Sequence, residues 1–229
     1  MNVLAQERPF FDWEWIGRNV DEIRAQIVEH LALTGVALGV GLAIAIALSL
    51  MALKWPRAYQ SISSVTGLLY TIPSLAVFAF VAPIAGIGTV EGRFITAEIA
   101  LVSYTLLILV RNIVTGLNGV PPETVEAAVG MGHQPLQVLR RIEIPLAMPV
   151  IIAGMRIATV TVVGLVTVTS LLGLGGLGFF ILNGLRKSIV FPTEIIVGVV
   201  LSVALAALLD LLIFLSGRAL TPWMRKSSA

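Results

Sequence analysis

Few side chains in this sequence could do covalent chemistry, and none of them has a partner at a useful spacing. The chain has no cysteine and only two histidines, His30 and His133, so thiolate nucleophiles are excluded and imidazole bases are scarce. An intramembrane enzyme needs a reactive pair, such as two aspartates or a serine with a histidine, whereas Asp210 stands alone. No GxxxxGK[ST] phosphate loop is present. The sequence therefore predicts a protein without a catalytic site of its own.

One glycine pattern imitates a nucleotide site. Gly173, Gly175 and Gly178 satisfy the GxGxxG spacing of dinucleotide-binding proteins, and Glu194 lies roughly where a ribose-binding acid would be sought. That fingerprint requires a short strand before it, inside a βαβ unit, whereas a bilayer-length apolar run precedes LLGLGGLGFF here. We expect a glycine-rich turn or a short re-entrant element at the outer face instead.

The most distinctive polar stretch is EAAVGMGHQPLQVLRRIEIP, residues 126–145, which lies between long apolar runs. Just before it, Pro122 suits the first turn of a helix, and the helix dipole favours the carboxylates of Glu123 and Glu126. Gly132 suits the left-handed residue that ends such a helix. The pattern predicts a short helix followed by a turn.

We expect a second short helix after that turn, because Pro135 suits its first turn. This helix would run through Ile142, and Pro145 would end it. The result would be a helix–turn–helix lying on the cytoplasmic surface. Ala127 and Ala128 would form a smooth face that a partner groove can approach closely. The residues alone would equally permit an amphipathic element on the membrane surface that has no partner.

The overall composition is that of an integral membrane protein. Hydrophobic residues make up 57% of the chain and charged residues 12%, and the mean hydropathy is +0.97. The formal net charge of +2, without a long basic cluster, excludes nucleic acid as a partner. We predict an all-α polytopic membrane helix bundle of about five transmembrane helices in a lipid bilayer. The apolar runs are Leu31–Leu53, Ile62–Ile87, Phe94–Val114, Pro149–Leu172 and Ile195–Ser216.

Residues 1–30 do not resemble a cleavable signal, because acidic residues interrupt any apolar core and no basic region precedes one. They predict an interfacial segment followed by an amphipathic approach over residues 19–30, although a loosely ordered polar tail is an alternative. The interfacial residues are Phe10, Phe11, Trp13, Trp15 and Ile16.

Basic residues between the runs predict the orientation, because cytoplasmic loops carry an excess of lysine and arginine. One side would hold Lys54, Arg57, Arg111, Arg140, Arg141, Arg218, Arg225 and Lys226. The other would hold Arg8, Arg18, Arg24, Arg93, Arg186 and Lys187, of which the first three are outnumbered by acids. We therefore expect residues 1–30 outside the cell, residues 31–216 in the membrane and the tail, residues 217–229, in the cytoplasm.

Two sets of residues are candidates for a solute path. A proline well inside the second run predicts a kinked or broken helix, and such breaks mark permeation paths about as often as plain kinks. Hydroxyls in the fourth run could line a mildly polar cavity, or each could bond back to a carbonyl one turn earlier. The candidates are Tyr70, Thr71, Pro73, Ser74, Thr167 and Ser170.

Three other features of the runs carry expectations. Gly35 and Gly39 form a GxxxG pair, which we expect to pack the first helix closely on a neighbour. Arg156 lies early in its run, so we expect it to extend to the cytoplasmic interface. Asp210 could pair with Arg218 or with a neighbouring helix.

The polar stretch resembles the EAA signature of permease subunits of binding-protein-dependent ABC importers, EAA-x3-G-x9-I-x-L-P. The matching residues are Glu126, Ala127, Ala128, Gly132, Ile142 and Pro145, with Ile144 in place of the leucine. Three further stretches look like those of the osmoprotectant subfamily, which carries glycine betaine, choline or carnitine: EHLALTGVALGVGLAIAI, YTIPSLAVFAFVAPIAGIGTV and LLGLGGLGFFI. The similarity covers most residues from 29 to 215.

The resemblance implies a five-span core of the methionine-permease type in a bacterial or archaeal cell membrane, paired with a second copy or a paralogous permease. Two cytoplasmic ATPase subunits would bind ATP and magnesium, and this chain would bind no cofactor or metal. The coupling segment, residues 121–145, would sit in an ATPase groove and contact it through the matched residues. An extracytoplasmic binding protein would deliver the solute, since the residues before Leu31 are too few to form one.

The substrate is less clearly indicated. Within the runs the tyrosines are Tyr70 and Tyr104, and all four tryptophans lie outside, so no aromatic cage for a quaternary ammonium is visible. Selectivity in the binding protein would explain this, but a permease for methionine, sulfonates or phosphonates fits as well. An ion-driven secondary transporter is a weaker alternative, because it would need intramembrane carboxylates and an internal repeat that the sequence does not convincingly provide.

Overall fold

The protein is described here by a computed structural model that covers residues 10–187 and 191–223. Within these ranges all regular secondary structure is helical, which confirms the all-α class. The helices are α1 (Trp13–Arg18), α2 (Val20–Lys54), α3 (Pro56–Thr71), α4 (Ser74–Ala85), α5 (Val90–Asn118), α6 (Pro122–Gly130), α7 (Pro135–Val138), a π-helical segment (Leu139–Glu143), α8 (Ile144–Thr169), a 3₁₀ turn (Ser170–Leu172), α9 (Gly178–Arg186) and α10 (Pro192–Leu220).

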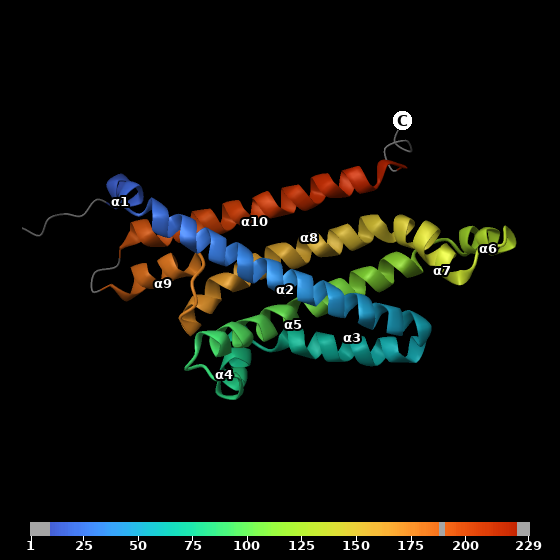
Figure 1. Ribbon diagram of the computed structural model, residues 1–229, viewed down its shortest axis with the longest axis horizontal. Coiled ribbons are helices and arrows are strands. Elements are labelled where there is room, and N and C mark those ends of the chain that lie inside the picture. Colours follow the sequence, from blue (N-terminus) through green and yellow to red (C-terminus); the bar gives the residue numbers. More distant parts are fainter. Residues whose placement is uncertain (1–9, 188–190, 224–229) are drawn as a thin grey trace, which may run out of the picture.

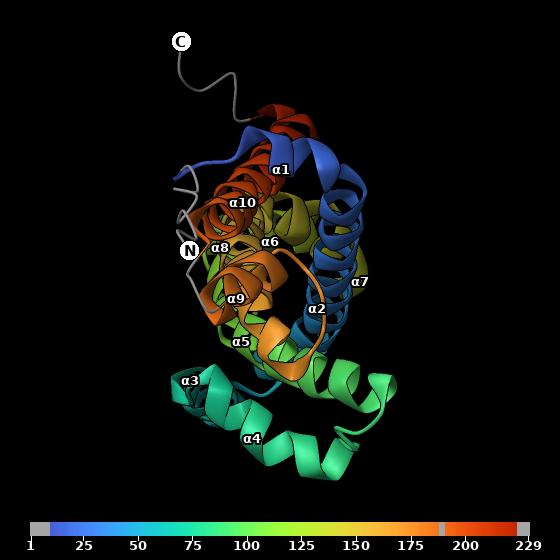
Figure 2. The same ribbon diagram turned by 90° about the vertical axis from the view of Figure 1, so that its left-hand side faces the viewer.

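Four helical stretches are long and apolar enough to cross a bilayer: α2, α5, the stretch Pro135–Leu172 and α10. Helices α3 and α4 pass the same test of length and composition only as a pair, bent by 96° at a short break, and they make a fifth span if the pair is counted as one. Figure 2 shows α4 lying across one end of the bundle. The expected number of spans is therefore confirmed, with the second one broken where its proline predicted.

The N-terminal part of the chain runs into the first span without interruption. Asp12 caps α1 by accepting a hydrogen bond from the Trp15 N–H at 2.9 Å. Helix α2 then begins at Val20, so the amphipathic approach and the first apolar run form one helix with no break at residue 30. The expectations for residues 1–9 and 224–229, including Arg8, Arg225 and Lys226, lie outside the described residues.

Helix α5 is at the centre of the packing and contacts α2, α3, α4 and α8. Small residues allow the close approach: a Cβ at Gly41 of α2 would lie 2.0 Å from Thr105 Oγ1, and one at Gly154 of α8 would lie 2.4 Å from Asn112 Cβ. A Cβ at Gly35 or Gly39, in contrast, would meet nothing within 4 Å among the described residues. The close packing expected of that glycine pair is not made within this chain.

The bundle has two distinct ends (Figure 1). Helices α1, α4 and α9 lie at one end, which we call the α9 end. The turn between α2 and α3, the helices α6 and α7 and the C-terminal part of α10 lie at the other, which we call the α6 end. Lys54, Arg140 and Arg218 are therefore at the same end of the molecule, as the alternation of basic residues predicted.

Candidate functional site

Helices α6 and α7 form a two-helix lobe that projects from the α6 end of the bundle (Figure 1). Pro122 and Glu123 lie in the first turn of α6, as expected from their preference for helix starts. Gly132 has a φ of +85°, and the His133 N–H donates to the Ala128 carbonyl at 3.2 Å. The predicted helix and its left-handed glycine turn are confirmed.

The second helix of the lobe differs from its prediction. Gln134 is the N-cap residue of α7, and the side chain of Gln137 accepts a hydrogen bond from the Gln134 N–H at 2.9 Å. The helix then continues through the π-helical segment into α8, so the prediction that Pro145 ends it is wrong. In the π segment the Ile144 N–H bonds to the Leu139 carbonyl, five residues earlier. This wider turn accommodates a following residue without an N–H, and the helix passes through Pro145.

The two alanines of the lobe do not share one exposed face. Glu126 and Ala127 are exposed, whereas Ala128 is 0% exposed. The expected smooth surface of two adjacent alanines is therefore wrong for Ala128, because successive residues on a helix point about 100° apart. Of the other matched residues, Gly132 is exposed, while Ile142 and Pro145 are half-buried.

The lobe also carries exposed apolar side chains, in α6, in the turn after it and in α7. Val129 is 58% exposed, Met131 73% and Leu136 63%. Two exposed arginines, Arg140 and Arg141, lie at the base of the lobe. Exposed apolar residues together with charged ones, on a lobe that projects from the bundle, are typical of a protein–protein contact.

A single helical stretch connects the lobe to the middle of the bundle. From Pro135 to Leu172 the backbone is helical without a break. Helix α8, which makes up most of this stretch, packs against α2, α5, α9 and α10. A displacement of the lobe would therefore move the helix that contacts most of the others.

The first set of path candidates lies at the break between α3 and α4. Thr71 is the last residue of α3, and Pro73 and Ser74 begin the redirected chain. The Tyr104 hydroxyl of α5 donates a hydrogen bond to the Ile72 carbonyl in the break. The ring of Tyr104 also meets that of Tyr70 edge-on at 5.5 Å. The break is thus held by α5 as a fixed feature of the fold.

The second set of path candidates lies near the end of α8. Thr167 donates to the Gly164 carbonyl at 2.7 Å, and Ser170 to the Thr167 carbonyl at 2.9 Å. Both hydroxyls therefore satisfy the helix itself, which is the simpler of the two alternatives. Figure 2 shows α5 between the α3–α4 pair and α8, so the structure does not bring the two sets together.

Arg156 and Asp210 form an ion pair within the bundle. Arg156 donates two hydrogen bonds to the Asp210 carboxylate, Nε to Oδ1 and Nη2 to Oδ2, each at 2.7 Å. The expectation that Arg156 extends to the interface is wrong, because α10 places a carboxylate within its reach. Asp210 pairs with a neighbouring helix, one of the two partners considered for it.

The glycine turn, residues 173–177, is tied to three helices. Glu29 Oε1 of α2 accepts from the Gly175 N–H at 2.8 Å, and Arg93 of α5 donates to the Gly173 carbonyl at 3.2 Å. On the α8 side, a Cβ at Gly178 would lie 1.9 Å from the Thr167 carbonyl oxygen, so only glycine fits. The turn is a helical connection without a βαβ unit, as expected.

His30 holds the same turn from inside the bundle. The side chain is 0% exposed, and its Nδ1 accepts a hydrogen bond from the Leu177 N–H at 3.1 Å. Its Nε2 lies 3.1 Å from the Val163 carbonyl of α8, which can only accept, so Nε2 carries the hydrogen. The ring is a neutral connector between three elements.

The sequence interpretation missed this cluster. Its partners are 133 to 147 residues apart along the chain, and no local spacing indicates such a pairing. The available signal was the adjacent pair Glu29 and His30 at the edge of an apolar run, together with a glycine-rich turn expected at the same end of the bundle.

Comparison with protein families gives one clear match. The family described as binding-protein-dependent transport system inner membrane component matches residues 35–226. This range contains the lobe, the π-helical segment and α8.

Known proteins similar to the chain agree with this match. The choline transport system permease protein OpuBB of Bacillus subtilis is 34% identical over 91% of this chain and 93% of its own length. The glycine betaine/carnitine/choline transport system permease protein OpuCB of the same organism is 33% identical over 89% of this chain and 91% of its own length. Among solved structures, an inward-facing MetNI methionine ABC transporter aligns with a TM-score of 0.76 and 21% identity, covering 92% of this chain and 100% of that chain.

Proposed function

Because the chain belongs to the family of binding-protein-dependent transport system inner membrane components, we propose that it is the permease subunit of an ATP-driven importer of a compatible solute. The solute would be of the glycine betaine, choline or carnitine kind, which the names of similar permeases from Bacillus subtilis support. The N-terminal segment would lie outside the cell, and the α6 end would face the cytoplasm.

The observation that carries the proposal is the projecting lobe with Glu126 and Ala127 exposed and α7 continuous with α8. A partner bound to the lobe could displace α8 directly, because no break separates α7 from α8. An ATPase dimer would have two binding sites for such lobes, one for each permease of a pair. Its closure on ATP binding would shift both helix bundles between two arrangements. The energy for this shift is the difference in ATP affinity between the open and closed dimer.

Three partners follow from this function. A cytoplasmic ATPase dimer would bind ATP and magnesium and hydrolyse the nucleotide, a second permease would complete the path, and an extracytoplasmic binding protein would deliver the solute at the α9 end. This chain would supply the path and the mechanical link.

The experiment is solute uptake into proteoliposomes that contain the permease, its ATPase and its binding protein. We expect radiolabelled glycine betaine, choline or carnitine to accumulate only with ATP inside, on the ATPase side. An ATPase variant that binds but does not hydrolyse ATP is the matched control and should abolish accumulation. Uptake that persists with this variant and follows an ion gradient would overturn the proposal.

A further inference from the structure

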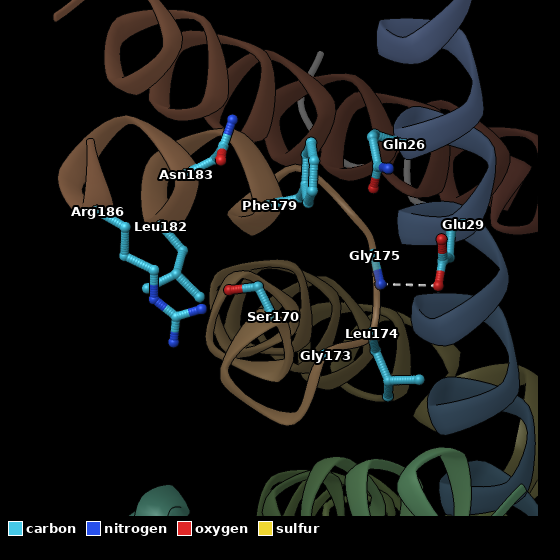
Figure 3. Close-up of a pocket in the computed structure, with 10 residues that line it drawn as sticks. All are labelled: Gln26, Glu29, Ser170, Gly173, Leu174, Gly175, Phe179, Leu182, Asn183 and Arg186. Atoms are coloured by element: carbon cyan, nitrogen blue, oxygen red, sulfur yellow. Dashed lines mark hydrogen bonds between the residues drawn. The ribbon is translucent and has the colours of Figure 1, made fainter. Parts of the chain in front are cut away.

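A cavity of about 390 Å³ opens at the α9 end of the chain. Its lining comes from α2, from the glycine turn and from α9 (Figure 3). This volume is within the range of sites for small organic ligands. The residues used below are Gln26, Glu29, Phe179, Asn183 and Arg186.

Gln26 contributes a buried amide to the wall of this cavity. The side chain is 8% exposed, and its Nε2 donates to Glu22 Oε1 at 2.6 Å. Because that bond fixes which way the amide points, the carbonyl oxygen Oε1 is turned toward Gly175 (Figure 3). Oε1 has no hydrogen-bond partner among the described residues. Because this oxygen is itself buried, it adds negative potential behind Glu29 but is not exposed to a ligand in the cavity.

Glu29 adds negative charge beside this oxygen. One carboxylate oxygen, Oε1, accepts from the Gly175 N–H, while Oε2 makes no hydrogen bond to any residue that the structure describes. A Cβ at Gly175 would lie 2.0 Å from Glu29 Oε2 and 2.6 Å from Gln26 Oε1. The two oxygens therefore pack closely against Gly175, and only a residue without a side chain allows this approach.

The rest of the lining differs in chemistry. Phe179 of α9 offers an aromatic ring that is 36% exposed, and the amide of Asn183 lies one helical turn further on. Arg186 lies on the side of the lining away from Glu29 (Figure 3). The cavity thus has acceptors and a negative charge at one end, an aromatic face between, and a positive charge at the other.

We infer that this cavity is a solute site of the permease itself, which binds the ammonium end of a small organic solute between Glu29 and Phe179. A carboxylate on the solute, as in glycine betaine, is met by Arg186, whereas choline lacks this group. Alkylated ammonium groups are held by carboxylates and aromatic faces through charge and cation–π attraction. The choice of solute rests on the proposed function, but the site rests on the geometry.

The test is equilibrium binding of radiolabelled choline and glycine betaine to the full-length permease in lipid nanodiscs, without binding protein or ATP. Glu29→Gln keeps an acceptor for Gly175 but removes the charge, and we expect it to weaken both ligands about tenfold. Arg186→Gln should weaken glycine betaine by a similar factor and leave choline unchanged. Arg24→Gln, an exposed position on the same helix away from the cavity, is the matched control and should change neither.

Two results would overturn the inference: no binding of either ligand to the wild-type permease, or equal binding by wild type and Glu29→Gln. Either result, obtained while the complete importer still accumulates solute with ATP, leaves the proposed function intact. Loss of ATP-dependent uptake in the wild-type importer would instead refute the proposed function.

Discussion

The two ends of the helix bundle are built on different principles. At the α6 end, the lobe is a local structure whose key groups, Glu126 and Ala127, are exposed and adjacent in sequence. At the α9 end, the glycine turn is held by His30, Glu29 and Arg93, which come from two helices far away along the chain. One end presents side chains outward, and the other encloses them.

This difference indicates how each end responds to substitution. Exposed residues of the lobe contribute little to folding. Changes there should therefore weaken the contact with a partner and leave the stability of the bundle unchanged. The buried polar groups around the glycine turn depend on one another, so changes there should first affect stability. The predictions below test this contrast from the largest expected effect to the smallest.

Ala127→Trp should have the largest effect on transport. A large ring on the exposed face of α6 would block a tight contact, and we expect ATP-driven uptake to fall at least about 30-fold, as for the loss of an interface hot spot. The melting temperature should stay as in wild type. Uptake and thermal unfolding measured on the same preparation check this.

Ala128→Trp is the matched control, because Ala128 is buried and the ring has no room. It should lower stability by about 1–3 kcal/mol as well as uptake. The contrast fails if both variants unfold at the same lowered temperature, or if Ala127→Trp transports normally.

His30→Phe should have the largest effect on stability. The substitution leaves the buried Leu177 N–H without its acceptor and removes the additional bond to the Val163 carbonyl of α8, at a cost of roughly 1–3 kcal/mol. Thermal unfolding in nanodiscs measures it. His133→Phe, at the half-buried histidine of the opposite end, should change stability by less than about 0.5 kcal/mol. Equal effects of the two substitutions would show that the ends do not differ in this way.

The pair Arg156 and Asp210 should show an intermediate effect, since both side chains are partly exposed in this chain. Asp210→Asn leaves the arginine without its countercharge, so it should lower the melting temperature more than the double variant Arg156→Met/Asp210→Leu. A double variant at least as unstable as the single one would contradict the pairing as the source of the effect.

Tyr104→Phe should have the smallest effect of the four. It removes the hydroxyl that bonds to the Ile72 carbonyl but keeps the ring against Tyr70. We expect a loss of about 1 kcal/mol, the usual contribution of one hydrogen bond. Tyr59→Phe, near the start of α3 and away from the break at its other end, is the comparison. No difference between the two would mean that α5 does not hold the break.

The features that the sequence predicted correctly are those carried by local chemistry. Bilayer length fixes the spans, Pro73 breaks the second one, and Pro122 with Gly132 sets the ends of the first lobe helix. In each case the residue acts on its own backbone or over one helical turn. The family signature was visible for the same reason.

The features that the sequence did not predict depend on neighbours that only the fold provides. Pro145 was expected to end a helix, but a π turn carries the chain past it. Arg156 was expected to reach the interface, but Asp210 lies 54 residues further along the chain and within hydrogen-bond distance. Ala128 faces inward because the lobe folds back on itself. The pairing of Arg156 and the burial of Ala128 reflect contacts that override a local preference, whereas the π turn is a local departure from the α-helix.

The most direct test of the central claim is crosslinking from the lobe. The natural chain has no cysteine, so Leu136→Cys and Ile84→Cys each carry a single thiol, one on the exposed face of the lobe and one at the exposed end of α4. In membranes that contain the full importer, a thiol-to-amine crosslinker should join position 136 to the ATPase and leave position 84 unattached to it. Crosslinks to the ATPase from position 84, with none from position 136, would contradict the account.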